Sequence, residues 1–293
     1  MKLATYEHNG QVRFGALKDG GLVDLTDDFG SVRTLLEGGD EAINRANAAI
    51  ASTTDTVSES DVRLLAPIGN PNKLLCLAGN YAEHIAEGRG EFHGKEKSTP
   101  RVFMKPPSTT IIGPGDAIQL PRNAQKIDWE CELAIVMGKH ARFVEASNGL
   151  DYVAGYTIII DVSERSLDVP DSREPRDGDK WFDWLNGKWF DTFAPTGPYL
   201  VLKDEIPDPQ TLPIKLRVNG ETKQDGNTGQ MIFNVAELVA WTSTLVTLEP
   251  GDIIATGTLS GVGAATGDFL KAGDNVEGEI EGIGVLKNPV TNA

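Results

Sequence analysis

The sequence predicts an α+β fold that is mainly β. The 293 residues include 32 glycines and 16 prolines, which supply turns at short intervals. Short runs rich in β-branched residues lie between these turns, as is typical of strands. The chain is long enough for one large domain with a small partner and a well-buried core.

The N-terminal part predicts a small domain over residues 1–65, followed by a larger one over 66–293. Short strands are expected in residues 1–27, because Asn9-Gly10 and Asp19-Gly20 are hairpin turn pairs. A helix is expected from Ser31 to Ser52, and the polar segment 53–61 is expected to be a linker.

The larger domain is expected to begin with a buried strand at Leu74, in LLCLAG. Residues 127–138 and 152–161 are the strongest strand candidates. Asn234, followed by Glu237, resembles an N-cap with an acid three residues on, which predicts a helix. Residues 168–188 are polar without a clear period, which predicts a long irregular loop.

Acidic residues outnumber basic ones by 43 to 27, which gives a net charge of −16. Such a field repels nucleic acid and anionic lipid, so neither is expected as a partner. An anionic substrate needs a local positive centre. Cys76 and Cys131 lie in apolar runs, which favours a reducing compartment. No apolar run has membrane-span length and no signal core begins the chain, so a cytoplasmic location is expected.

Three acids alternate with apolar residues in the stretch KIDWECELAIVMGK. Asp128, Glu130 and Glu132 share one face if this segment is a strand. Taken alone, the pattern favours a strand face that points to water. The other interpretation is a site for Mg²⁺ or Mn²⁺, which prefer carboxylate oxygens.

A further acid, Asp161, ends the apolar run of GYTIIID. That run predicts a strand covered on both faces, where an isolated carboxylate is costly. A turn or capping role would explain the residue. A cation shared with Glu130 and Glu132 would satisfy all three acids.

Other candidate residues lie on either side of these acids in the sequence. His84 and Glu87 would share one face of a helix and hydrogen-bond, either as an oriented base or as a surface pair. Lys105 and Lys188 stand in apolar or aromatic surroundings, where they would supply positive charge unless they are ordinary surface lysines. The Gly/Thr-rich loop 255–263 offers N–H groups and hydroxyls to a carboxylate and lacks nucleotide-loop spacing.

Taken together and in order, these segments resemble the fumarylacetoacetate hydrolase family, from about Leu74 to Leu286. The motifs that carry the resemblance are NYAEHIAE, FMKPPSTTIIGPGDAI, DWECELAIVMGK, GYTIIIDVSERSLD, GKWFDTFAPTGP, VNGETKQDGNTGQMIFNVAELVAW and LEPGDIIATGTLSGVG. The resemblance implies a mixed β-roll catalytic domain with a small N-terminal domain, a homodimer, and a Mg²⁺ or Mn²⁺ site.

By matching motif, the resemblance implies a role for individual residues. The metal ligands would be Glu130, Glu132 and Asp161. The base dyad would be His84 with Glu87, and Lys188 would be the catalytic lysine. Substrate contacts are expected from Lys105, Gly257 and Thr258.

Two motifs depart from the family pattern. Where the family often has S-A-R-D-x-Q, this chain has Ser163-Glu164-Arg165-Ser166-Leu167-Asp168, so a pocket glutamine is either missing or replaced by Asp168. The family's T-G-T-P is here Thr256-Gly257-Thr258-Leu259. The expected ligands are unaffected, whereas the identity of the substrate is not fixed.

The expected function is a metal-dependent hydrolase that cleaves a carbon–carbon bond of an acylpyruvate, giving pyruvate and a carboxylic acid. A fumarylpyruvate- or maleylpyruvate-like substrate of aromatic catabolism fits the resemblance. The alternatives are an oxaloacetate decarboxylase, or an isomerase (tautomerase) of a 2-hydroxydienoate, because each forms a similar enolate. A non-catalytic metal-binding protein is the third possibility.

Overall fold

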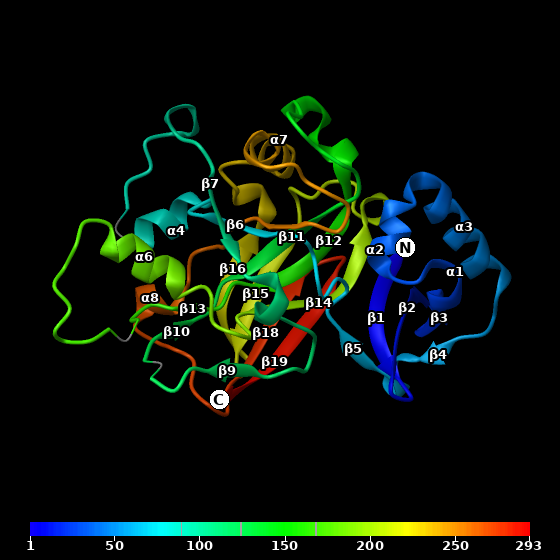
Figure 1. Cartoon of the computed structure of the whole chain (residues 1–293), viewed down its shortest axis with the longest axis horizontal. Coiled ribbons are helices and arrows are strands. Elements are labelled where there is room, and N and C mark those ends of the chain that lie inside the picture. Colours follow the sequence, from blue (N-terminus) through cyan, green and yellow to red (C-terminus); the bar gives the residue numbers. More distant parts are fainter. Residues whose placement is uncertain (89, 124, 168) are drawn as a thin grey trace.

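The computed structural model describes residues 1–88, 90–123, 125–167 and 169–293. The fold is α+β and mainly β, as the sequence predicts. Two sheets form the centre, with helices at both ends of the molecule (Figure 1). Within the described ranges, no helix is long and apolar enough to cross a membrane.

The larger sheet has twelve strands within the described residues. Its main path runs β4 (Val57–Ser58), β3 (Gly21–Asp24), β2 (Gln11–Lys18), β1 (Lys2–His8), β14 (Ala194–Leu202), β12 (Val153–Ile160), β11 (Cys131–Met137), β17 (Ile253–Ala255), β6 (Leu74–Ala78) and β7 (Arg101–Lys105). Off this path, β5 (Arg63–Leu65) pairs with β1 and β8 (Ile111–Ile112) pairs with β14.

The smaller sheet packs against the middle of the larger one. Its order is β16 (Glu221–Asn227), β15 (Pro213–Val218), β18 (Asn275–Ile280), β19 (Gly284–Asn292) and β9 (Ile118–Leu120). The approach is close, because a Cβ added to Gly278 of β18 would lie 3.0 Å from Cys131 Sγ. Every residue of β11 is buried between its neighbours, so this strand is a rigid support. A separate short pair joins β10 (Ile127–Asp128) to β13 (Ser163–Glu164).

The helices gather in three places (Figure 1). Their bounds are α1 (Thr26–Phe29), α2 (Val32–Glu37), α3 (Gly39–Ser52), α4 (Ala82–Glu87), α5 (Pro107–Thr110), α6 (Asp179–Asn186), α7 (Val235–Leu245) and α8 (Gly263–Thr266). The short 3₁₀ turns are η1 (Glu59–Asp61), η2 (Lys95–Lys97), η3 (Ala146–Tyr152), η4 (Lys203–Glu205) and η5 (Thr228–Gln230). Helices α4, α6 and α8 lie at the end of the molecule opposite the N-terminal segment (Figure 1).

The N-terminal segment is joined to the larger sheet by strand pairing. β1 pairs with β14 through Lys2↔Val201 and Leu3↔Leu200, and the predicted hairpin turns connect β1, β2 and β3. The helix predicted over 31–52 forms as two helices, α2 and α3, which meet at Gly38. The domain division at residue 65 stays a prediction.

Two predicted irregular segments contain regular structure. The expected linker 53–61 includes β4, which pairs with β3, and the turn η1. The expected loop 168–188 includes helix α6, so that prediction is wrong for its second half. The helix gains its stability from tertiary packing, since the Trp184 ring lies 5.0 Å from the ring of Phe103 on β7.

The predicted N-cap of α7 is confirmed as a full capping box. The Asn234 side chain accepts from Glu237 N at 2.9 Å, and Glu237 Oε2 accepts from Asn234 N at 2.9 Å.

Replacing Asn234 by Ala should lower the free energy of unfolding by about 1 kcal/mol, because a helix N–H loses its acceptor. Urea denaturation measures this change. Asn234→Asp, which keeps the acceptor, is the control; an equal loss in both variants would contradict the account.

Candidate metal and catalytic site

Three buried carboxylates meet at the end of β11. Glu130 and Glu132 alternate along this segment, and Asp161 immediately follows β12. The register pairs Glu132 with Ile159, and Asp161 N donates to Glu130 O at 2.8 Å. One carboxylate oxygen of each acid lies within 4.8 Å of the others. The acids are 0–5% exposed, so a water-facing strand is excluded.

Two lysines neutralise part of this negative charge. Lys188 Nζ lies 2.6 Å from Glu130 Oε2 and 2.6 Å from Asp161 Oδ2. Lys105 Nζ donates to Asp161 Oδ1 at 2.5 Å and to two backbone carbonyls. Both lysines are buried, so the surface interpretation is wrong for each. The three bonds of Lys105 leave no ammonium hydrogen for a substrate.

Glu132 is the acid whose charge is least compensated. Its Oε2 accepts from Gly257 N at 2.7 Å, while Oε1 is buried without a partner among the described residues. Burial, with the nearby charges of Asp161 and Glu130, holds the pKa of Glu132 well above its usual range. An orphaned carboxylate oxygen beside two further acids fits a divalent cation, which takes oxygen ligands of this kind.

Glu130 has the opposite electrostatic environment. Burial opposes its ionisation, but the positive charges of Lys188 and Arg165 outweigh that effect and lower its pKa below the usual range. Burial likewise opposes the charge of Lys188, and Asp161 and Glu130 raise the pKa of Lys188 nonetheless. Both groups are therefore charged at neutral pH.

Arg165 joins the cluster and was missed by the sequence interpretation. Its guanidinium contacts Glu130 Oε1 and donates from Nε to Asp128 Oδ2 at 2.8 Å. Asp128 is fully buried and also accepts from Gly263 N at 2.5 Å. Asp128 thus anchors Arg165 and is not one of the three clustered acids. The pairing of Asp128 with Ser163 brings Asp128 and Arg165 together. The two paired strands are too short to give a periodic pattern in the sequence, so the contact could not be predicted.

His84 and Glu87 form a hydrogen-bonded pair on α4. His84 Nδ1 lies 2.7 Å from Glu87 Oε1, and Glu87 Oε2 accepts from Gly261 N at 2.8 Å. The predicted hydrogen bond between His84 and Glu87 is present, and Gly261, in the loop after β17, binds the second carboxylate oxygen of Glu87. His84 faces the same cavity as Glu130 and Lys188.

The Gly/Thr-rich loop holds the acids more than it exposes groups to a ligand. Gly257 gives its N–H to Glu132, and its φ of +88° suits glycine. Thr258 Oγ1 donates to Cys131 O at 2.9 Å and accepts from Gln224 Nε2 at 2.9 Å. Thr258 still lines the cavity, and 2% of its surface is exposed.

A cavity of about 550 Å³ opens beside the acids. The residues that line it include His84, Glu87, Glu130, Lys188 and Thr258. Lys105 is not on these walls; it lies behind Asp161. The predicted place of Asp168 lies outside the described residues.

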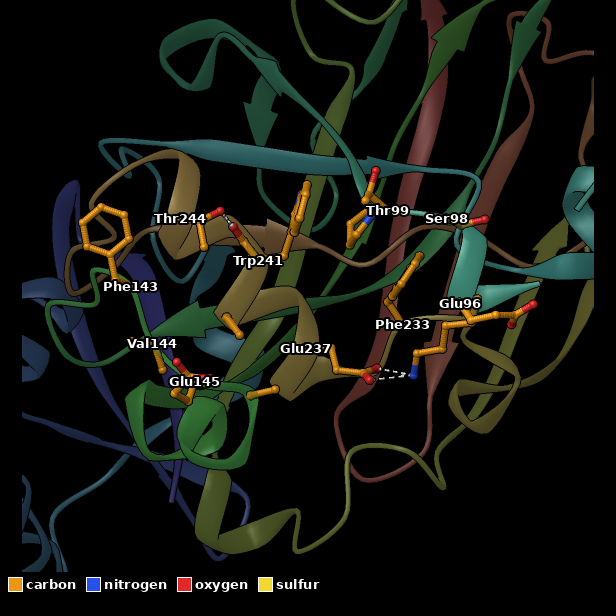
Figure 2. Close-up of a pocket in the computed structure, with 14 residues that line it drawn as sticks. Glu96, Ser98, Thr99, Phe143, Val144, Glu145, Phe233, Glu237, Trp241 and Thr244 are labelled. Atoms are coloured by element: carbon orange, nitrogen blue, oxygen red, sulfur yellow. Dashed lines mark hydrogen bonds and ion pairs between the residues drawn. The ribbon is translucent and has the colours of Figure 1, made fainter. Parts of the chain in front are cut away.

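A larger groove of about 870 Å³ lies over α7 (Figure 2). It contains none of the predicted site residues, and its acid Glu237 is engaged by Lys95 at 2.6 Å and by the helix cap. Figure 2 shows the aromatic rings of Phe143, Phe233 and Trp241 around it. The groove is larger than the cavity, but its lining does not include the three clustered acids.

Two family profiles together match nearly all of the chain. The profile described as fumarylacetoacetate (FAA) hydrolase C-terminal matches residues 73–291, and that described as Rv2993c-like, N-terminal, matches residues 1–67. The chain belongs to the fumarylacetoacetate hydrolase family. Membership in this family supports the prediction that the chain is an enzyme.

Curated relatives and solved structures carry several activities. Oxaloacetate tautomerase fahd2, mitochondrial, of Xenopus laevis is 43% identical over 281 residues, covering 94% of this chain and 84% of that protein. Maleylpyruvate hydrolase from Sphingobium sp. SYK-6 has a TM-score of 0.82 at 28% identity, with full coverage of both chains. The same hydrolase in complex with manganese(II) and pyruvate has a TM-score of 0.80 at 26% identity, again with full coverage of both chains.

An isomerase also shares this fold. The 5-carboxymethyl-2-hydroxymuconate delta-isomerase of Mycobacterium smegmatis has a TM-score of 0.75 at 32% identity, covering 100% of this chain and 99% of that one. The fold and the family are thus settled, and a divalent-metal site is supported by the buried acids together with the manganese-bound neighbour.

Replacing Glu132 by Gln should abolish metal binding while leaving the metal-free protein folded. Because the folded-state pKa of Glu132 is raised, the metal-free protein binds this proton more tightly when folded, and its stability falls as pH rises above about 4.3. Glu132→Gln should remove that loss. In wild type, Mn²⁺ at a hundred times its Kd should add about 2.7 kcal/mol, and this gain should vanish in the variant.

Thermal unfolding with and without Mn²⁺ measures both effects, and Glu281→Gln, which removes an exposed acid, is the control. A metal-free Glu132→Gln protein less stable than wild type at pH 8, or one that Mn²⁺ still stabilises fully, would contradict this account.

Proposed function

We propose that this chain is a divalent-cation-dependent tautomerase of a 2-oxo acid such as oxaloacetate. The observation that carries the proposal is the buried acid cluster with Lys188, in one cavity with the His84–Glu87 pair. The tautomerase relatives, at 43% identity over 94% of the chain, favour proton transfer over bond cleavage. This choice follows the alternative of the sequence interpretation rather than its main hydrolase expectation.

Glu130, Glu132 and Asp161 would hold the Mg²⁺ or Mn²⁺ ion. When bound, such an ion stabilises the negative charge that develops on the substrate oxygens. Lys105 holds Asp161 from behind, and Arg165 holds Glu130 from the side. These two cations hold Asp161 and Glu130 in position before substrate arrives.

His84 is the proposed base. Glu87 engages Nδ1, which leaves Nε2 to take a proton from C3 of the keto acid. The electron pair of that C–H bond becomes the double bond of the enol, and the keto oxygen gains a proton. Lys188 is the proposed donor of this proton, and exchange of one proton with water then restores His84 and Lys188. Reversal of the same steps returns the keto form.

Acylpyruvate hydrolysis is the second candidate, as the sequence interpretation first expected. It is favoured by the similarity to maleylpyruvate hydrolase, at a TM-score of 0.82. His84 would then take its proton from water, and the hydroxide would attack the distal carbonyl. The bond between that carbon and C3 would break, so that a carboxylic acid forms and the pyruvate enolate leaves and regains a proton at C3. Product analysis on oxaloacetate and acylpyruvates separates tautomerisation, decarboxylation and hydrolysis. Turnover of none of them would favour a non-catalytic metal-binding protein.

The assembly and location proposed here follow the sequence interpretation. We propose a homodimer, so the mass in solution should be twice the 31.5 kDa of the chain. Light scattering coupled to size exclusion measures it. A cytoplasmic location stays a prediction, and the named relatives above include a mitochondrial protein.

Replacing His84 by Asn should lower the kcat for oxaloacetate tautomerisation by about 100-fold or more, because the proton acceptor is lost. KM should change little, since the acids and Lys188 remain. The decay of enol absorbance measures the rate in the Mn²⁺-loaded enzyme. His140→Asn, an exposed histidine outside the cavity, is the control. An unchanged kcat in His84→Asn would rule out this base.

A further inference from the structure

Two cations on the cavity wall have no ion-pair partner within the described residues. Arg101 at the start of β7 and Lys180 on α6 both line the cavity and are exposed. The other two cations of this wall, Lys188 and Arg165, are already held by the buried acids. In a chain of net charge −16, free positive charge beside a catalytic cluster requires an explanation.

Strand β7 connects Arg101 to the acid cluster. Arg101, Phe103 and Lys105 alternate along this strand and so share one face. Lys105 contacts Asp161 at one end, and Arg101 lies about 13 Å away along the backbone, at about 3.3 Å per residue. This face of β7 therefore carries the buried Lys105 beside Asp161, then Phe103, and then the exposed Arg101.

Helix α6 repeats this order on the neighbouring wall. Lys180 lies one helical turn before Trp184, and Lys188 follows the helix. Trp184 packs on Phe103 with ring centroids 5.0 Å apart, and Lys188 Nζ lies 5.5 Å from the Trp184 ring. Packing of the two aromatic residues fixes α6 against β7. Lys180, near the start of α6, and Arg101, at the start of β7, therefore line the same cavity.

We infer that Arg101 and Lys180 bind the distal carboxylate of a substrate that carries a carboxylate at each end. The inference rests on the proposed function, in which the 2-oxo acid end lies at Glu130, Glu132 and Asp161. Trp184, which lines the same cavity, then contacts the carbon chain. A guanidinium and an ammonium on two different elements suit one carboxylate, since each offers N–H donors. These two residues select a dianion over a monoanion.

Matched ligand pairs test this selection directly. Each pair differs only in a carboxylate against a methyl group at the distal end: oxaloacetate and 2-oxobutanoate, 2-oxoglutarate and 2-oxopentanoate, and 2-oxoadipate and 2-oxohexanoate. Calorimetric titration of the Mn²⁺-loaded protein gives the Kd of each acid. In at least one pair the diacid should bind about tenfold or more tightly than its monoacid.

Arg101→Gln and Lys180→Gln should each lose most of that ratio and leave monoacid binding unchanged. Lys139→Gln, which removes an exposed charge outside this cavity, should keep the ratio. A ratio near one in every pair for wild type, or a ratio unaffected in both variants, overturns the inference. Because the readout is binding, a protein that keeps the ratio but turns over no substrate refutes the proposed function alone.

Discussion

The site depends on the balance of charge among buried side chains. Three carboxylates lie at the end of β11 with almost no exposure, and isolated buried charges of this kind are very costly. Lys105 and Lys188 converge on Asp161, and Arg165 contacts Glu130, so two of the acids are compensated. Glu132 keeps one oxygen without a partner among the described residues. The remaining imbalance is what a divalent cation would remove.

Strand register converts this charge balance into a fixed geometry. The antiparallel pairing of β11 with β12 sets Glu130 beside Asp161, and the buried apolar residues of both strands hold that register. The same scaffold occurs in relatives named as tautomerase, hydrolase and isomerase. The proposed reactions share an enolate, so the difference between them lies in what surrounds the acids. Among the described residues on the walls of this cavity, Arg101 and Lys180 are the cations without an ion-pair partner, and we infer that they recognise the rest of the substrate.

Glu130, Glu132 and Asp161 were predictable from the sequence because local patterns identify them. Alternation placed Glu130 and Glu132 on one face, and an apolar run marked Asp161 as a buried charge. Helix α7 was predictable from its capping box, which is also local. Arg165 was missed because its role depends on the pairing of β10 with β13, and α6 was missed because its aromatic face finds Phe103 only in the folded chain. Gly257 was expected at the substrate, whereas its N–H holds Glu132.

The central claim is that Glu130, Glu132 and Asp161 together bind one divalent cation. Anomalous diffraction at the manganese absorption edge, from crystals of the intact protein grown with Mn²⁺, locates the ion without reference to activity. The account predicts a single strong anomalous peak within bonding distance of all three carboxylates. A well-occupied crystal with no peak at these acids, or with peaks only at surface carboxylates, would contradict it.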